Sequence, residues 1–210
     1  MFPSLYAILD PSLIQQPVVT FAKTLSDAGV RLFQLRDKRA SSRQIFAEAS
    51  ELASALAPLD ARLILNDRPD IAAIVRAGGV HVGQEDLSVE AARRICGPQC
   101  WVGVSTHDLQ QLREADGTSA DYIAVGPVFP TATKENPDPV VGIDFLREAR
   151  KLTRKPLVAI GGITVESAPD VFRAGADSVA VIRDLLLASD PAARAREYLA
   201  AAESVRLTRS

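Results

Sequence analysis

The sequence predicts an α/β fold, a closed (β/α)8 barrel of eight parallel strands. Strand-like and helix-like patterns alternate eight times along the 210 residues, which is typical of parallel strands joined by crossover helices. The repeating units are about 25 residues long and follow one another without a break in composition. Glycine ends several predicted helices, at Gly29, Gly78 and Gly175, where a left-handed residue closes the last turn. A doubly wound open sheet is the alternative, but eight regular units favour closure, with residues 1–210 as a single barrel domain.

The strands and helices follow from the spacing of apolar residues. Apolar runs predict strands at residues 5–9, 31–35, 62–65, 80–83, 101–105, 122–125, 157–160 and 178–182. Helical periodicity predicts helices at residues 18–28, 42–56, 70–77, 89–95, 109–115, 143–152, 165–174 and 192–202.

Composition narrows the class of protein. Hydrophobic residues make up 47% of the chain and charged residues 24%, as in an ordinary soluble domain with a sizeable core. A net charge of −2 argues against nucleic acid or an anionic membrane as the main partner. No secretory signal or membrane-spanning stretch is visible, so we expect a cytoplasmic protein that acts on small molecules; a homo-oligomer is left open. Cys96 and Cys100 have no second Cys/His pair, and reduced cysteines are expected.

The stretch Phe33-Gln34-Leu35-Arg36-Asp37-Lys38 carries the first candidate site. Alternate side chains of a strand share a face, so Gln34, Arg36 and Lys38 line one surface. On a strand covered by helices, such polar groups need a ligand or buried partners. An arginine fork and a lysine point charge suit an anionic, phosphorylated ligand.

Two carboxylates follow neighbouring strands, Asp67 after the third and Asp86 after the fourth. The carboxyl ends of barrel strands gather on one rim, so these side chains should lie close together. One or two carboxylates with water and phosphate oxygens suit Mg²⁺. The alternative is that both cap helices, which is a serious rival for Asp86 because Ser88 precedes the same predicted helix.

A second anion site is predicted at the ends of strands seven and eight. Gly161-Gly162 and Ile182-Arg183 lie where such barrels often hold a phosphate on backbone N–H groups. The alternative is a plain turn. Residues 126–142 form a long proline-containing connection with Thr131, Thr133 and Lys134, which predicts a lid over the rim.

At these residues the chain resembles the thiamine phosphate synthase family. The resemblance runs from Tyr6 to about Leu187 and rests on the motifs Gln34-Leu35-Arg36-Asp37-Lys38, Asn66-Asp67, His81-Val82-Gly83-Gln84-Glu85-Asp86, Ser105-Thr106-His107, Gly126-Pro127-Val128-Phe129, Thr131-Ala132-Thr133-Lys134 and Ala159-Ile160-Gly161-Gly162-Ile163. It implies a Mg²⁺-dependent transferase of thiamine biosynthesis that joins hydroxymethylpyrimidine diphosphate to thiazole phosphate and releases diphosphate.

The resemblance also implies roles for individual residues. Asp67 and Asp86 would hold Mg²⁺, and the implied catalytic residues are Arg36, Lys38, Ser105 and Lys134. The implied substrate-binding residues are Gln34, Leu35, Arg36, Asp37, Lys38, Asn66, Ser105, Thr131, Ala132, Thr133, Lys134, Gly162, Ile182 and Arg183. Departure of diphosphate from carbon needs neutralisation of charge more than a strong base.

One departure and two alternatives stay open. Arg183 stands where the family usually has a small hydroxyl residue, which puts that side-chain contact in doubt. His81 could be a satisfied barrel residue, and His107 could reach a ligand. A sister family isomerises the thiazole phosphate with a rim histidine, and a non-catalytic barrel could sense thiamine phosphates. The synthase is favoured because the whole charged set is present, namely Arg36, Lys38, Asp67, Asp86 and Lys134.

Overall fold

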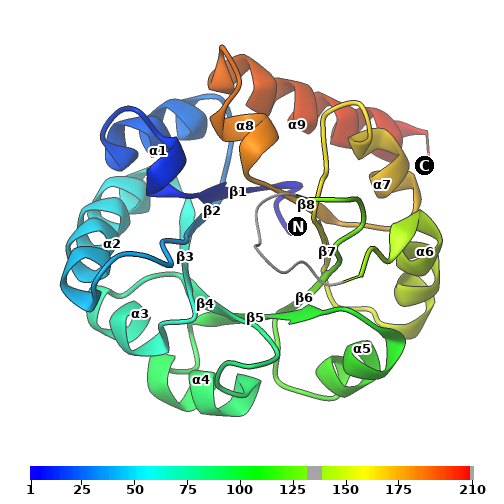
Figure 1. Ribbon diagram of the computed structural model, residues 1–210, viewed down its shortest axis with the longest axis horizontal. Coiled ribbons are helices and arrows are strands. Elements are labelled where there is room, and N and C mark those ends of the chain that lie inside the picture. The colour runs from blue at the N-terminus through cyan, green and yellow to red at the C-terminus, as the bar shows by residue number, and fades with distance from the viewer. Residues whose placement is uncertain (132–138, 209–210) are drawn as a thin grey trace.

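The protein forms a closed barrel of eight parallel strands in the order of the sequence (Figure 1). A computed structural model describes residues 1–131 and 139–208. The strands are β1 (Leu5–Leu9), β2 (Leu32–Leu35), β3 (Arg62–Asn66), β4 (Gly79–Val82), β5 (Trp101–Thr106), β6 (Tyr122–Val125), β7 (Leu157–Ile160) and β8 (Ser178–Val181). Parallel pairing of β1 with β8 closes the barrel, which confirms the predicted fold class.

Helices surround the barrel and connect consecutive strands (Figure 1). They are α1 (Val18–Asp27), α2 (Ser42–Leu56), α3 (Pro69–Val75), α4 (Val89–Cys96), α5 (Leu109–Asp116), α6 (Gly142–Leu152), α7 (Ala168–Arg173), α8 (Arg183–Leu186) and α9 (Pro191–Leu207), with short 3₁₀ turns at Pro11–Leu13 and Ala57–Leu59. Capping residues explain several helix starts. Ser41 forms a reciprocal capping box with Gln44, and Asp108 accepts two N–H groups at the start of α5.

The apolar residues form two cores, one on each side of the barrel wall. Side chains inside the barrel make a small cluster: Tyr6, Ile8, Leu32, Ile64, Tyr122, Ala124 and Val158. The larger cluster lies between the strands and the helices, and it contains Phe33, Leu35 and Leu65. Neighbours along one strand, such as Leu32 and Phe33, therefore face opposite cores, which is the alternation expected of a strand covered on both faces.

Three helix ends differ from the sequence prediction by more than one residue. The largest difference is in α9, which continues to Leu207, five residues past its predicted end at residue 202. Gly29 and Gly175 have the expected positive φ, at 107° and 117°, but Gly78 does not. The left-handed residue that ends α3 is Arg76, with φ 54°, two residues before that glycine. Helix α7 begins only at Ala168, because residues 164–167 form a turn in which the Ser167 hydroxyl accepts the Thr164 N–H.

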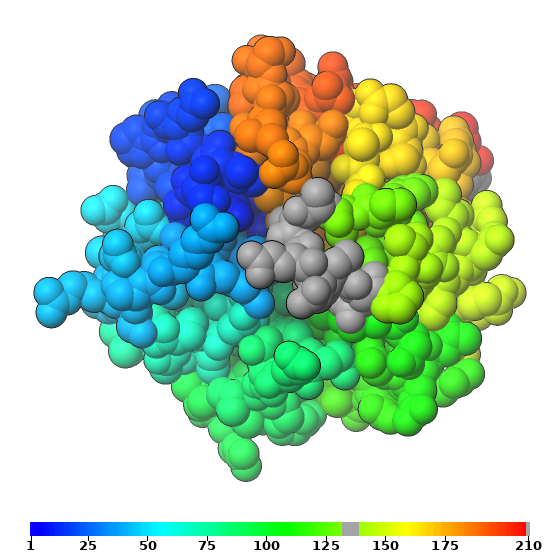
Figure 2. Space-filling view, viewed as in Figure 1, coloured from blue at the N-terminus to red at the C-terminus, as the bar shows by residue number. Residues whose placement is uncertain are grey.

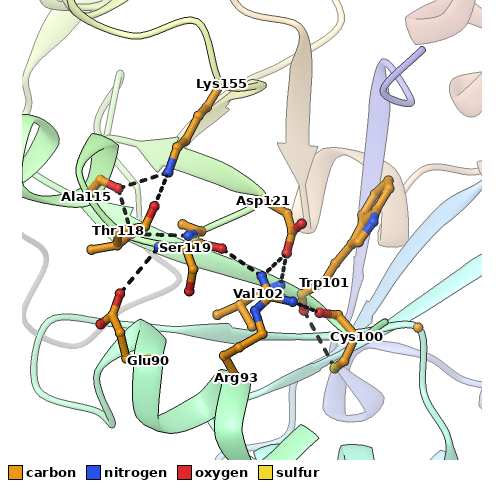
Figure 3. A network of polar contacts seen from close by, with 12 residues as sticks. Glu90, Arg93, Cys100, Trp101, Val102, Ala115, Thr118, Ser119, Asp121 and Lys155 are labelled. Carbon is orange, nitrogen blue, oxygen red and sulfur yellow. Dashed lines mark hydrogen bonds and ion pairs between the residues drawn. The ribbon is translucent and has the colours of Figure 1, made fainter. Parts of the chain in front are cut away.

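Partly buried arginine–aspartate clamps fix the strand starts at the N-terminal end of the barrel. Asp121 precedes β6, and its carboxylate accepts the Val102 N–H at 2.7 Å and pairs with Arg93 of α4 at 2.5 Å (Figure 3). Asp177 repeats this arrangement before β8, accepting the Leu157 N–H and an Arg150 N–H, both at 2.8 Å. Each clamp ties one helix to two strands, so this end of the barrel is held by directed polar contacts.

Figure 2 shows the same face as Figure 1 with its side chains, and the successive β/α units follow one another around the centre. α8, in orange, lies beside the blue N-terminal units, in keeping with the pairing of β1 and β8. Among the described residues, no helix combines the length and the apolar character needed to cross a bilayer.

Candidate active site

A cavity of about 850 Å³ opens at the C-terminal ends of the strands. The side chains that the sequence placed on this rim gather here, namely Gln34, Arg36, Lys38, Asn66, Asp67, Asp86, Ser105, Thr131, Gly162, Ile182 and Arg183. They come from seven of the eight units, because the carboxyl ends of parallel barrel strands share one rim.

Two predicted binding residues lie outside the cavity. Leu35 is 2% exposed and packs in the core between strands and helices, because its side chain leaves the opposite face of β2 from Gln34. Asp37 accepts the N–H groups of Arg39 and Ala40, so it shapes the turn after β2. Neither side chain lines the cavity, so a contact of these two residues with substrate stays a prediction. Ala132, Thr133, Lys134 and the central part of the predicted lid lie outside the described residues.

Asp67 and Asp86 both line the cavity, and the Asp86 carboxyl is close enough to raise the pKa of Asp67. Asp67 adopts a left-handed backbone with φ 60°; its carboxylate accepts the Asn66 amide at 2.6 Å and lies 3.7 Å from the Lys38 ammonium. Asp86 accepts the Gly83 N–H at 2.8 Å, while Ser88 caps α4. The capping alternative for Asp86 is therefore removed, and its carboxylate belongs to the rim.

The pKa of Asp67 is raised to about 6. Burial is the main cause and the Asp86 carboxyl adds to it, whereas Lys38 and Arg36 act to lower the pKa. Two carboxylates held this close disfavour each other's ionised form unless a cation lies between them. The donor atoms are all oxygens, with the Asn66 amide beside them. This donor set fits Mg²⁺, which binds one or two carboxylates and completes its shell with water and phosphate oxygens.

Glycines form the opposite side of the cavity. Gly161 and Gly162 have φ of 91° and 63°, and a Cβ at Gly162 would lie 2.3 Å from the Pro130 carbonyl oxygen. Any side chain there would push the loop after β6 away from the loop after β7. Gly162 is thus required for packing between these two loops, in addition to any role in admitting a ligand.

A hydrogen-bonded chain crosses the barrel interior beneath the cavity. The Gln34 amide donates to the Tyr6 hydroxyl at 2.7 Å, and the Tyr6 and Tyr122 hydroxyls are 3.0 Å apart. His81 bridges the rest, with Nδ1 3.0 Å from the Tyr122 hydroxyl and Nε2 2.9 Å from the Ser105 hydroxyl. Burial raises the pKa of both tyrosines well above its ordinary value, so both hydroxyls are neutral hydrogen-bonding groups.

Ser105 is held from two directions. The Gln84 amide donates to its backbone carbonyl at 2.6 Å, while His81 contacts its hydroxyl. The other histidine, His107, lines the cavity with its Nδ1 2.5 Å from the Gly126 carbonyl oxygen. His81 is accordingly a buried barrel residue that orients Ser105, and His107 lies at the rim.

The comparisons with known proteins agree with this geometry. The family model described as thiamine monophosphate synthase matches residues 5–185. This chain belongs to the thiamine monophosphate synthase family.

Relatives of the family match along most of the chain. The thiamine-phosphate synthase of Koribacter versatilis is 54% identical over 204 residues, covering 94% of each chain. That of Methanospirillum hungatei is 41% identical and covers 86% of this chain and 87% of the relative. The solved thiamine phosphate pyrophosphorylase of Pyrococcus furiosus superposes with a TM-score of 0.88 at 32% identity, covering 96% of both chains.

Arg183 was predicted to lie near the second anion site. This residue is the first of α8, it is exposed, and it lines the cavity. Its neighbour Asp184 accepts the Tyr198 hydroxyl at 2.7 Å and lies 3.6 Å from Arg194, so the start of α8 is anchored to α9.

Sequence reasoning missed the two interior tyrosines that connect the site residues. Tyr6 lines the cavity, and Tyr122 lies below it in the interior cluster. A tyrosine at an inward-facing position of a strand could have indicated such a role, since a buried phenol needs a hydrogen-bond partner. The sequence does not say which partner that is.

Proposed function

We propose that this protein is a thiamine-phosphate synthase and that the cavity at the strand ends is its active site. The reaction joins hydroxymethylpyrimidine diphosphate to thiazole phosphate and gives thiamine phosphate and diphosphate. The observation that carries the proposal is the set of two cations, Arg36 and Lys38, facing a pair of close carboxylates on one rim in a chain of this family. A diphosphate bound through a divalent cation needs such a set.

Asp67 and Asp86 would hold Mg²⁺, with Asn66 beside them. When bound, the ion supplies charge neutralisation for the diphosphate that leaves. Arg36 and Lys38 contribute two positive charges to the same end of the cavity, and the guanidinium can bind two phosphate oxygens at once. The implied contact from Lys134 is part of the proposal, although this residue lies outside the described part of the chain.

The bond changes need little proton transfer from the protein. The carbon–oxygen bond between the pyrimidine methylene and diphosphate breaks, and diphosphate leaves with the electron pair. The thiazole nitrogen then donates its lone pair to the methylene carbon. An electron-rich aminopyrimidine can stabilise the developing cation itself, so the rim has to neutralise the leaving group and position both substrates.

Ser105 is suited to hold the pyrimidine diphosphate in place. Its hydroxyl contacts His81 and its carbonyl is bound by Gln84, so the residue has little freedom to move. The thiazole phosphate fits the other side of the cavity, where Gly162, Ile182 and Arg183 line the wall together with Asp184. The two anions would then approach from opposite sides of the barrel mouth.

The activity is tested by mixing both substrates with the protein and Mg²⁺. We expect thiamine phosphate and diphosphate in equal amounts, and loss of turnover when EDTA removes the metal. Absence of thiamine phosphate under these conditions would exclude the proposed function.

Asp86→Asn tests the metal site. This change removes one charge from the carboxylate pair, so turnover should fall by at least about a hundredfold, in line with losing a main source of electrostatic stabilisation. Asp170→Asn is the matched control, because Asp170 pairs with Arg173 on the surface of α7. Full activity of Asp86→Asn at limiting Mg²⁺ would show that this carboxylate does not hold the metal.

A further inference from the structure

A second cavity, of about 610 Å³, lies at the opposite end of the barrel, where the strands begin. Its lining contains no residue of the proposed active site. Four arginines line it, namely Arg31, Arg62, Arg76 and Arg206. The proposed synthase activity uses none of them, so their gathering needs a separate physical account.

The barrel topology brings these arginines together. Arg31 directly precedes β2 and Arg62 opens β3, and the two backbones are joined by the Arg62 N–H and the Arg31 carbonyl at 2.8 Å. Arg76 ends α3, just before β4. Parallel strands that begin at one edge therefore place three arginines side by side, and Arg206 in the last turn of α9 completes the set.

Positive charge in this cavity is poorly balanced. Among the described residues that line it, only Asp60 carries a carboxylate. None of the ion pairs seen in the described part of the chain involves these four arginines, whereas Arg68, Arg93, Arg150 and Arg194 all have carboxylate partners. The whole chain carries −2, so this is a local excess of positive charge on an acidic protein. Close like charges in a concave site raise the local concentration of anions.

Arg62 is also held in a fixed orientation. Its guanidinium lies 3.9 Å from the centre of the Trp101 ring, and its Nη1 donates to the Gly78 carbonyl at 2.9 Å. A Cβ at Gly78 would lie 2.4 Å from Cγ of Arg62, so the glycine makes room for this arrangement. A guanidinium fixed by an aromatic ring and one hydrogen bond keeps further N–H donors for a ligand and loses little entropy on binding.

An aromatic surface lies beside the arginines. The Phe2 ring stacks on Trp101 with centroids 5.4 Å apart and 14° between the ring planes. The cavity thus combines a cationic wall with flat apolar rings, a pairing that suits an anion alone or an anion attached to an aromatic ring.

We propose that this cavity binds a small molecule carrying a multivalent phosphate group, a diphosphate or triphosphate, at a site separate from the substrate-binding rim. The group is either free polyphosphate or the phosphate chain of a nucleotide. Both share the chemistry that the arginines recognise. A nucleotide would place its base against the rings of Phe2 and Trp101.

Trp101 provides a local reporter, because it is the single tryptophan of the chain. Inorganic triphosphate is titrated into the metal-free protein while tryptophan fluorescence is followed, and ATP is titrated in parallel. We expect a saturable change, since a ligand on Arg62 alters the cation stacked on the indole. Tighter binding of ATP than of triphosphate would assign the site to nucleotides, and equal or weaker binding of ATP would assign it to polyphosphate.

Arginine variants decide where the ligand binds. Arg62→Ala should weaken binding by about tenfold or more, and Arg206→Ala, at an exposed position, by about twofold to fivefold. Arg154→Ala is the matched control, because Arg154 is exposed in the connection that leads into β7 and does not line the cavity. It should leave binding unchanged. If Arg62→Ala does not fold, Arg206→Ala and Arg76→Ala carry the test.

A separate experiment excludes binding of triphosphate at the active site. Calorimetric titration of the Arg36→Ala/Lys38→Ala protein with triphosphate should still give one site, while turnover of Arg206→Ala should match that of the unchanged protein. No fluorescence change up to millimolar triphosphate, no calorimetric site in that variant, or an equal loss of affinity in Arg154→Ala would overturn the proposal.

Discussion

At the scale of single residues, Asp67 shows how the proposed metal site acts against the stability of the metal-free protein. Its folded pKa is about 6, above the ordinary 3.8, mainly because the carboxyl is buried and lies beside Asp86. Between about pH 4 and 6, the Asp67 carboxyl therefore carries a proton in the folded state, whereas in the unfolded state it has already lost that proton. The free energy of unfolding falls as pH rises through this window, and the full loss is present at pH 7.

The prediction is that Asp67→Asn stabilises the metal-free protein at neutral pH. Asparagine tolerates the left-handed backbone at this position and carries no charge to bury. The free energy of unfolding should rise by about 1–3 kcal/mol at pH 7.5, and the gain should vanish below about pH 4. Urea denaturation at the two pH values measures it, with Asp170→Asn as the surface control. An unchanged or lower stability at pH 7.5 would mean that the carboxyl is not destabilised in the fold.

A second residue-scale prediction concerns Tyr122, whose hydroxyl connects Tyr6 to His81. Tyr122→Phe keeps the ring in the interior core and deprives His81 Nδ1 of the tyrosine hydroxyl beside it. The free energy of unfolding should fall by about 1–3 kcal/mol. Turnover should also fall, because His81 orients Ser105.

Thr106→Val is the matched control for this test. Thr106 lies on β5 next to Ser105, and its buried hydroxyl donates to the Ala124 carbonyl at 3.1 Å, outside the chain that reaches Ser105. The variant should lose stability and keep its turnover. If both variants keep full turnover, the hydrogen-bonded chain is a structural feature of the barrel and does not position Ser105.

At the scale of elements, the sequence predicted the strands within one or two residues and the helices except α8. This helix has only four residues, too few for a periodic pattern to be recognised. Apolar periodicity works for the strands because most of them contribute to a core on both faces. Apolar periodicity does not predict short turns. The start of α7, for example, depends on a turn in which the Ser167 hydroxyl accepts the Thr164 N–H.

Only part of the candidate site could be predicted from the sequence. Closure of the barrel places every strand end on one rim, so Asp67 and Asp86 could be paired from the strand order alone. Leu35 and Asp37 were assigned because they belong to a motif, but strand alternation turns the first toward the helices and the second closes a turn. Partners of Tyr122 could not be predicted, because they lie on β1 and β4, far away in sequence.

The interior of the barrel leads to a prediction for β5. A Cβ at Gly103 would lie 2.0 Å from the Tyr122 ring, which fills the space that this glycine leaves. Gly103→Ala must therefore displace a large buried ring that cannot shorten, and it should cost about 1–3 kcal/mol in the free energy of unfolding. Gly97→Ala, where a Cβ would meet no atom within 4 Å, is a useful comparison although its φ of 90° adds backbone strain. Equal stability losses from the two changes would argue against crowding at the ring.

At the scale of the whole molecule, the two ends of the barrel have different tasks. The C-terminal rim collects two close carboxylates, which disfavour folding of the metal-free protein at neutral pH, together with cations and glycines of positive φ. The N-terminal end carries the clamps of Asp121 with Arg93 and of Asp177 with Arg150, which join helices to strand starts. Separating these ends by the length of a strand lets the rim carry chemistry while the other end contributes stability.

This separation predicts opposite outcomes for changes at the two ends. Asp177→Ala leaves the Leu157 N–H and the Arg150 guanidinium without their carboxylate. Because the clamp is partly exposed, water can replace some of the lost contacts, and the free energy of unfolding should fall by about 1–2 kcal/mol. For a chain of this size, the melting temperature should fall by roughly 2–8 °C. Turnover at 25 °C should be unchanged, because β7 lies between the clamp and the rim.

Asp86→Asn provides the reverse case, with turnover lost and the melting temperature equal or higher. Both variants are measured by thermal unfolding and by formation of thiamine phosphate at 25 °C. Asp121→Ala should behave like Asp177→Ala, because its carboxylate makes the same kinds of contact before β6. A large loss of turnover in either clamp variant, at a temperature where it remains folded, would show that the two ends of the barrel are mechanically coupled rather than independent.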